Sequence, residues 1–277
     1  MHPVVAIYAT FLGRAFDQVL MDVALHRLPV TFVLDRAGIT GPDGPSHHGM
    51  WDLSVFSHVP GLRIAAPRDA ARLAELLDEA VAFGQEPSML RFPKGTVAKA
   101  TEPVERVDGL DVIHRSRAHS RDVLLVAIGP LAANAVEAAK ELEGFGIGAT
   151  VVDPRWVLPV SDTLVDLAAR HRLVVTAEDG LRHGGVGSAL LQVCADRRIT
   201  TPLVSLGLPS AFIPHGSRDQ LLEQAGLSVE AIVNAVLVAR SIRTPAPDSG
   251  LRGVPGRRPA PARAPKTSTA PTEGKAR

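Results

Sequence analysis

A loop rich in glycine and proline, residues 35–52, carries side chains that can bind anions and exchange protons. The loop contains Arg36, Asp43, His47 and His48, which together span thirteen positions. Glycines and prolines alternate there, so neither a helix nor a sheet ladder can persist. The loop follows an apolar run at 30–34, and loops at the carboxyl ends of strands in α/β sheets are where ligands usually bind. The loop is therefore a candidate binding and catalytic site.

Two simpler interpretations of this loop stay open. Asp43 and His47 are also typical of solvated turn residues without a catalytic role. A metal site made of His47, His48 and His58 is disfavoured, because adjacent histidines in a loop diverge and no third ligand stands at helical spacing.

A second pair of cations follows another apolar run, at 88–92. Arg91 and Lys94 flank the end of this run, and Gly95 follows them. Arginine can bind a phosphate or carboxylate through two parallel hydrogen bonds, whereas lysine acts as a point charge. The pair is compatible with an anion site and, equally, with two solvated surface cations.

A glycine-rich segment, residues 184–187, opens a predicted helix. It resembles a phosphate cradle, but its spacing is not a complete dinucleotide fingerprint. The sequence favours a helix start packed tightly against a neighbouring element. Cys194 lies on the apolar side of that helix, which predicts a core position.

Strand and helix patterns alternate along the chain, which predicts α/β domains with parallel or mixed sheets and helices on both faces. Residues 1–100 form the first domain and residues 122–243 the second, with 101–121 as a linker that holds one strand near 111–114. Strands are predicted at 3–8 (buried on both faces), 30–34, 62–66, 88–92, 123–128, 149–152, 173–176 and 203–206. Helices are predicted at 11–27, after an Asp69 cap, at 134–142, from a Ser161 cap to 170, at 187–196, at 220–224 and at 229–242.

The charge distribution singles out the last 34 residues. Residues 244–277 carry seven Lys or Arg against two acidic residues and seven of the 22 prolines, which predicts a disordered basic tail. The net charge of +1 for the whole chain leaves −4 for residues 1–243, so no nucleic-acid surface is expected. The chain has one cysteine, no basic leader and no apolar run near the ~20 residues that cross a bilayer. We therefore expect a cytoplasmic protein without a membrane anchor.

Five segments in one order closely resemble the 1-deoxy-D-xylulose-5-phosphate synthase family, thiamine-diphosphate enzymes related to transketolase. The segments are 8–18 (YATFLGRAFDQ), 35–47 (DRAGITGPDGPSH), 90–95 (LRFPKG), 153–156 (DPRW) and 213–216 (IPHG). The resemblance covers the family's second half: a transketolase-like pyrimidine-binding domain, truncated at its amino terminus, and a transketolase C-terminal domain. It implies joining of decarboxylated pyruvate to D-glyceraldehyde 3-phosphate, an entry step to isoprenoids and thiamine.

The resemblance also implies roles for individual residues. Tyr8 and Phe11 match aromatic contacts to the cofactor's aminopyrimidine. Three residues match polar groups that face the reacting carbons: Arg14, Asp43 and His47. The resemblance implies that His47 forms a hydrogen bond or transfers a proton there. The match for the aldehyde's phosphate is Arg36 and Lys94, with Arg91 nearby; many relatives carry Arg where Lys94 stands.

Parts of the family's pattern do not occur in residues 1–277. The Gly-Asp-Gly…Asn motif for the diphosphate and its Mg²⁺ has no match, and the chain begins just past the family's activating glutamate, with no acidic residue before Asp17. Three hypotheses follow. The chain is one subunit of a split thiamine-diphosphate enzyme, completed by a chain with the diphosphate domain; or a non-catalytic remnant or dimerising module with an exposed apolar patch; or its coding region begins further upstream. Family dimers are usual, so a homodimer is expected.

Overall fold

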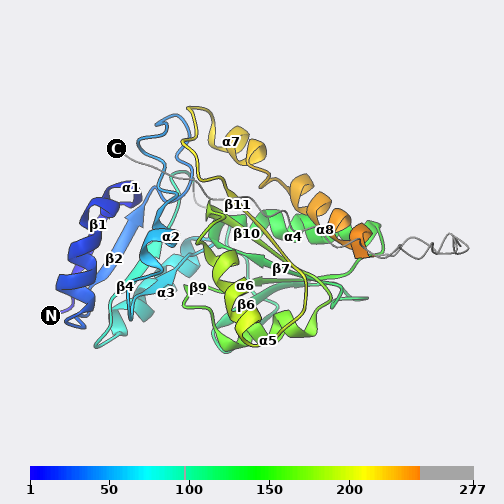
Figure 1. The fold of residues 1–277 in the computed structure, drawn as a ribbon, viewed down its shortest axis with the longest axis horizontal. Coiled ribbons are helices and arrows are strands. Elements are labelled where there is room, and N and C mark those ends of the chain that lie inside the picture. The colour runs from blue at the N-terminus through cyan, green and yellow to red at the C-terminus, as the bar shows by residue number, and fades with distance from the viewer. Residues whose placement is uncertain (97, 244–277) are drawn as a thin grey trace, which may run out of the picture. The chain divides into compact units, whose positions relative to one another are not determined.

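The computed structural model describes residues 1–96 and 98–243, which contain two β-sheets and the helices that cover them (Figure 1). Both sheets belong to one compact unit, Met1–Arg243. The tail predicted to be disordered, residues 244–277, lies outside the described residues.

The first sheet has five strands in the order β1-β2-β4-β3-β9. Its first four strands run parallel, as the alternating strand and helix pattern predicts. The fifth, β9, comes from the second half of the chain and pairs antiparallel with β3. The bounds are β1 Val4–Tyr8, β2 Thr31–Asp35, β3 Arg63–Ala65, β4 Ser88–Arg91 and β9 Trp156–Leu158.

Strand β1 is not buried on both faces, so that prediction is wrong. It lies at the edge of the sheet and pairs only with β2, which leaves Val4 51% and Val5 39% exposed. An apolar sequence alone cannot distinguish a central strand from an edge strand, because the difference depends on which strands pair.

The helix predicted at 11–27 begins earlier and changes its winding. It starts as α1 (Ala9–Leu12), tightens into η1 (Gly13–Ala15) and widens into η2, a π-helix over Gln18–Ala24. The predicted apolar face is confirmed, since Leu12 and Val19 are buried and Phe16 and Val23 pack against the core.

The second sheet has six strands in the order β11-β10-β7-β8-β6-β5. The three pairings from β11 to β8 are parallel, and β6 and β5 add antiparallel strands at one edge. These two strands lie in the stretch expected to be a linker, so that stretch also builds the second sheet. The bounds are β5 Glu105–Val107, β6 Leu110–Arg115, β7 Val123–Ala127, β8 Ala149–Asp153, β10 Val174–Leu181 and β11 Leu203–Leu208.

Both predicted N-caps are confirmed: the side chain of Asp69 accepts from the Arg72 amide, and that of Ser161 from the Leu164 amide. The remaining helices are α2 Asp52–Phe56, α3 Ala70–Ala82, η3 Gly129–Leu131, α4 Ala132–Gly144, α5 Asp162–Arg170, α6 Val186–Asp196, α7 Arg218–Gln224 and α8 Val229–Arg243.

One stretch, residues 218–241, is long and apolar enough by composition to cross a membrane, with a mean hydropathy of 1.5. In the structure it consists of two helices, α7 and α8, with Gly226 between them at a φ of 74°. Leu221, Leu227 and Val236 from this stretch are buried in the core of the second sheet. The expectation that no stretch approaches the length and apolar character of a membrane span is therefore wrong by composition, and 28% of this stretch's most apolar window is buried.

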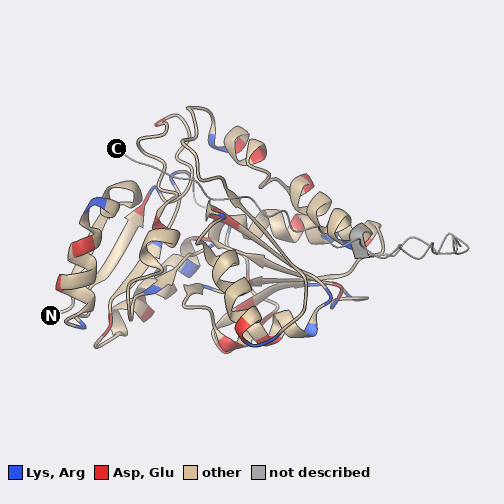
Figure 2. Ribbon diagram, in the orientation of Figure 1, with Lys and Arg blue, Asp and Glu red and all other residues tan. Residues whose placement is uncertain are grey.

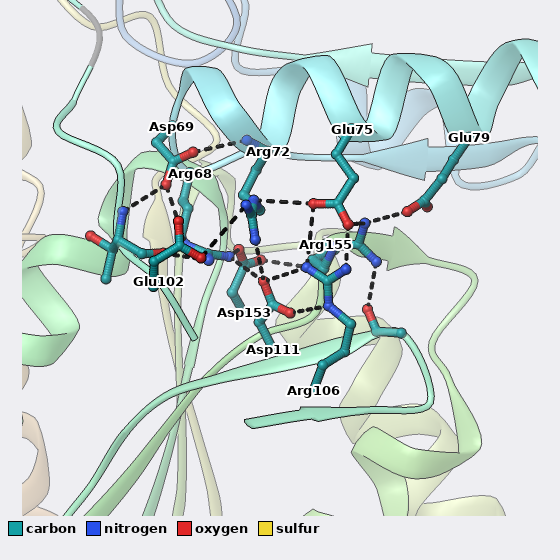
Figure 3. A network of polar contacts seen from close by, with 12 residues as sticks. Arg68, Asp69, Arg72, Glu75, Glu79, Glu102, Arg106, Asp111, Asp153 and Arg155 are labelled. Carbon is teal, nitrogen blue, oxygen red and sulfur yellow. Dashed lines mark hydrogen bonds and ion pairs between the residues drawn. The ribbon is translucent and has the colours of Figure 1, made fainter. Parts of the chain in front are cut away.

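A network of arginines and carboxylates joins helix α3 and the residues before it to the second sheet (Figure 3). The buried Arg68 donates to Asp111 at 2.7 Å and to Asp153 at 2.6 Å. Burial raises the pKa of Asp153 to about 6, against the attraction of Arg68. Next to it, the carboxylate of Glu79 accepts from Trp156 Nε1 at 2.7 Å and from Arg155. The 153–156 segment therefore joins the two sheets rather than contributing to the candidate site.

Candidate functional site

The candidate site lies at the carboxyl ends of β1 and β2, where Tyr8 and Asp35 are the last residues of their strands. The ring of Tyr8 stacks on that of Phe11, with centroids 5.6 Å apart and planes 17° from parallel. The guanidinium of Arg36 lies 4.0 Å from the centroid of the Tyr8 ring. The sequence places these residues 28 positions apart, and the parallel pairing of β1 with β2 brings them together.

A carboxylate lies between the two cations that were matched to a phosphate site. The ammonium of Lys94 donates to both carboxylate oxygens of Asp43, at 2.9 and 2.8 Å, and Arg36 Nε lies 3.9 Å from Asp43 Oδ2. The hydrogen bond from Lys94, aided by the charges of Arg36 and His47, lowers the pKa of Asp43 below its ordinary value. The negative charge beside these two cations is therefore a carboxylate of the chain itself.

His47 and Arg14 complete the same cluster. The imidazole of His47 meets the edge of the Phe11 ring at 5.7 Å and bonds to Ser46 Oγ through Nδ1 at 2.9 Å. The guanidinium of Arg14 lies 5.8 Å from the centroid of that same ring. Contacts between side chains thus connect the seven residues Tyr8, Phe11, Arg14, Arg36, Asp43, His47 and Lys94, and the roles that the resemblance implies for them stay predictions.

Arg91 does not join this group. It is buried, and its Nε donates to Asp52 at 2.6 Å while its second guanidinium nitrogen donates to the carbonyl of Asp179 at 2.8 Å. The side chains at the end of a strand alternate between faces, and Arg91 points into the interior while Lys94, beyond the strand, reaches Asp43. A phosphate has no access to Arg91 in this arrangement.

His48 also has a structural role. Its Nδ1 accepts from the amide of Thr40 at 3.1 Å, so the other ring nitrogen carries the proton and donates to the carbonyl of Pro214 at 3.4 Å. The side chain is fully buried. His48 therefore connects the loop to the second half of the chain through this hydrogen bond. Separately, the described residues contain no group of three or more His, Cys, Asp or Glu that could hold a metal ion.

The second half of the chain holds this loop, which sequence reasoning missed. Asp179 Oδ1 accepts from the amide of Ile39 at 3.0 Å, and Arg218 donates to the carbonyl of Ile39. Strand β10 runs five residues past its predicted end at 176, to Leu181, and Asp179 lies in this extension. The one sequence signal was the 213–216 segment, which lies next to Arg218 and was matched without a role.

The glycine-rich segment is a tightly packed helix start, as predicted. The carboxylate of Glu178 accepts from the amides of Val186 and Gly187 at 2.8 and 2.9 Å, and a Cβ on Gly185 would overlap it. Burial raises the pKa of Glu178 to about 7. Because this carboxyl group already occupies the helix amino terminus, the segment does not bind a phosphate there.

The residues of the site fit one half of thiamine diphosphate. The aromatic pair Tyr8 and Phe11 offers flat surfaces of the kind that an aminopyrimidine ring packs against. The diphosphate and its Mg²⁺ need a set of oxygen ligands, and the described residues contain no acidic or histidine group of that kind. The fit is therefore to the pyrimidine end of the cofactor.

Comparison with protein families gives two matches that follow each other along the chain. Residues 1–99 match the pyrimidine binding domain of transketolase, and residues 101–232 match the transketolase C-terminal domain. Together they cover both sheets described above.

Relatives with a curated name are longer than this chain. A 1-deoxy-D-xylulose-5-phosphate synthase from Leifsonia xyli subsp. xyli is 58% identical over 84% of this chain, and 1-deoxy-D-xylulose-5-phosphate synthase 1 from Kitasatospora griseola is 56% identical over 91%. The chain spans 36% and 38% of the length of these two proteins.

A solved structure of similar length has the same fold. A protein described as a split gene transketolase, in an inactive β4 tetramer, superposes with a TM-score of 0.77 at 30% identity. The superposition covers 87% of this chain and 77% of that one.

Proposed function

The chain belongs to the transketolase family, and we propose that it is the pyrimidine-binding and acceptor-binding part of a 1-deoxy-D-xylulose-5-phosphate synthase. Such an enzyme converts pyruvate and D-glyceraldehyde 3-phosphate into 1-deoxy-D-xylulose 5-phosphate and CO₂, for isoprenoid and thiamine synthesis. The observation that carries the proposal is the meeting of Arg36, Asp43 and Lys94 beside the stacked rings of Tyr8 and Phe11.

The residues of the site divide into three tasks. Thiamine diphosphate would supply the nucleophilic carbon, and Tyr8 and Phe11 would hold its pyrimidine ring. Arg36 and Lys94 bind the phosphate of the aldehyde, which orients its carbonyl group. His47 exchanges a proton with the carbonyl oxygen of the aldehyde, while Asp43 and Arg14 set the charge around it.

The proposed enzyme also needs a diphosphate site with Mg²⁺, and the matches in residues 1–277 are to the pyrimidine-binding and C-terminal domains. The similarity to a split gene transketolase supports a second polypeptide as the source of that site. We propose that two copies of this chain, each with such a partner, form the cytoplasmic enzyme; the single cysteine suits a reducing compartment.

A second candidate function is a dimerising module without activity of its own. Large apolar side chains are exposed on β1 and on the helix that follows it, at Val4 (51%), Val5 (39%), Met21 (45%) and Leu25 (64%). Exposed apolar surface of this kind is typical of a face that another polypeptide covers. Both candidates share this feature, so reconstitution of activity separates them.

The test of the proposed function is reconstitution. The purified chain is mixed with a diphosphate-binding domain taken from a 1-deoxy-D-xylulose-5-phosphate synthase, thiamine diphosphate, Mg²⁺, pyruvate and D-glyceraldehyde 3-phosphate, and product and CO₂ are measured. We expect turnover from the mixture and none from either polypeptide alone. A complex that assembles in size-exclusion chromatography but releases no CO₂ would favour the inactive module.

Calorimetric titration of the chain alone with D-glyceraldehyde 3-phosphate tests the acceptor site separately. We expect weak binding that falls with rising salt, because two cations carry it. Lys94→Gln removes one of them and should abolish the heat of binding. Arg63→Gln is the matched control, since Arg63 is a half-exposed cation outside the cluster.

A further inference from the structure

Two side chains from the second half of the chain form hydrogen bonds to the backbone of Ile39, in the loop that carries Asp43 and His47. Asp179 Oδ1 accepts from the amide of Ile39, and Arg218 donates to the carbonyl of Ile39. Arg218 and Asp179 form an ion pair with each other at 2.5 Å. Both hydrogen-bonding groups of one peptide residue are therefore held by one pair of charges.

The Asp179 side chain is fixed in place, because it is buried and because the backbone of the same residue also bonds to Arg91. The side chain of Asp179 is 1% exposed, and its backbone carbonyl accepts from Arg91 at 2.8 Å. Gly38, the residue before Ile39, has a φ of 71° and no room for a Cβ, which would overlap the carboxylate of Asp179. The backbone here packs directly on the acid.

The second half of the chain also holds the far end of the same turn. His48 donates to the carbonyl of Pro214, and the imidazole of His215 packs against Gly44 so closely that a Cβ there would overlap it. Asp43 and His47 lie between these two anchored ends.

The segment between the anchors is itself short and cross-linked. The amide of Gly44 donates to the carbonyl of Gly41 at 3.2 Å, and the amides of His47 and His48 donate to the carbonyl of Gly44 at 3.0 and 3.2 Å. Because these bonds make residues 41–48 a compact turn, fixing its ends fixes the positions of Asp43 and His47 as well.

We propose that Asp179 and Arg218 are positioning residues for the phosphate site: they hold the loop at Ile39 and thereby fix the backbone that carries Asp43 and His47. The inference rests on the proposed function, because it concerns the same aldehyde phosphate. Neither residue touches the substrate, so their effect passes through the loop backbone. A pre-organised loop binds its ligand more tightly, since less ordering is left for the binding step.

The test combines amide hydrogen exchange with calorimetry on four variants of the full chain. Arg218→Gln removes the charge, and Arg218→Lys keeps the ion pair but loses the fork that reaches both Asp179 and Ile39. Asp179→Asn keeps an oxygen for the amide of Ile39 and removes the charge. Arg197→Gln is the control, because Arg197 pairs with Asp162 on the surface.

We expect Arg218→Gln to speed exchange at residues 38–49 about tenfold and to weaken D-glyceraldehyde 3-phosphate binding about tenfold, the loss expected for one charge-assisted hydrogen bond. Exchange in the core strand β7 stays unchanged. Arg218→Lys falls between Arg218→Gln and the wild type, and Arg197→Gln matches the wild type.

Three results would overturn the inference. Unchanged exchange at residues 38–49 in both Arg218→Gln and Asp179→Asn would mean that the pair does not hold the loop. Faster loop exchange with unchanged affinity would mean that the grip has no effect on the site. A wild-type chain that binds no aldehyde phosphate would overturn the proposed function as well, and this case differs from the first two because the wild type itself fails.

Discussion

The ammonium of Lys94 bonds to both carboxylate oxygens of Asp43, and therefore any anion that binds Lys94 competes with a side chain of the same site. Asp43 is partly solvent-accessible, with 26% of its side chain exposed, so it can turn away from Lys94 when another anion arrives. Asp43 thus presents to Lys94 the negative charge that a bound phosphate would present.

Asp43→Asn should therefore tighten the binding of inorganic phosphate to the chain. The neutral amide bonds less strongly to Lys94, which leaves the ammonium available to the ligand. Calorimetric titration at constant salt measures the change, with Glu137→Gln as the control because that acid is exposed and pairs with Lys140 at the surface. In the reconstituted enzyme the same substitution should slow turnover. Equal or weaker phosphate binding in Asp43→Asn would mean that Asp43 does not compete.

Arg91→Met should destabilise the fold without a direct loss of phosphate contacts. Arg91 and Asp52 form a buried pair at 2.6 Å with side chains 2% and 0% exposed, and removal of one partner of such a pair costs about 3–5 kcal/mol. Arg63→Met is matched to it, since Arg63 lies on the neighbouring strand and pairs with Glu86 at the surface, a pair worth at most about 1 kcal/mol. Urea unfolding of both variants gives the comparison. Equal losses would show that the burial of Arg91 is not decisive.

Gly38→Ala should cost more stability than Gly61→Ala, although both glycines have nearly the same left-handed backbone, with φ of 71° and 74°. A side chain at Gly61 meets nothing within 4 Å, so only the backbone penalty of about 1–2 kcal/mol remains. At Gly38 it also overlaps the buried carboxylate of Asp179, which adds about 1–3 kcal/mol of overpacking. Thermal and urea unfolding test this difference. Gly38→Ala should also weaken phosphate binding, whereas Gly61→Ala should not.

Glu178 should make the stability of the protein fall as the pH rises toward neutrality. Its pKa in the folded chain is about 7, above the ordinary 4.5, so the folded state holds this proton more tightly than the unfolded state. The free energy of unfolding therefore decreases between these two values, by at most about 3 kcal/mol, since one pKa unit corresponds to about 1.4 kcal/mol.

Glu178→Gln removes this titration, and its stability relative to the wild type should rise across the same pH range. The substitution also disturbs the bonds to Val186 and Gly187, which adds an offset that does not depend on pH. Urea unfolding at several pH values, with Glu137→Gln as the control, measures the relative change. A difference that stays constant with pH would contradict the raised pKa.

The sequence was informative where a local pattern decides the structure. Asp69 and Ser161 were predicted as helix caps, and both accept the expected backbone hydrogen bond. A helix cap depends on residues that are three positions apart, so it can be predicted from one sequence alone. The grouping of Tyr8, Arg36 and Lys94 was also expected, but from resemblance to known enzymes and not from spacing.

The features that the sequence could not predict depend on which strands pair and on which side of a strand a residue faces. The edge position of β1 follows from sheet order, and apolar composition is the same for edge and central strands. Arg91 and Lys94 are three residues apart, yet one is buried against Asp52 and the other reaches Asp43. The grip of Asp179 on Ile39 joins residues 140 positions apart, and no local pattern encodes a contact of that range.

Strand β9, Trp156–Leu158, belongs by position in the chain to the second half, but it pairs with β3 of the first sheet. A polypeptide cut near residue 100 would therefore leave its first piece one strand short, with the edge of β3 uncovered and Glu79 without its partners Arg155 and Trp156. Gene fusions or domain exchanges that treat the two matched regions as separate modules would divide a single sheet between two proteins. Both sheets stay whole only where the stretch from β1 to β11 moves together.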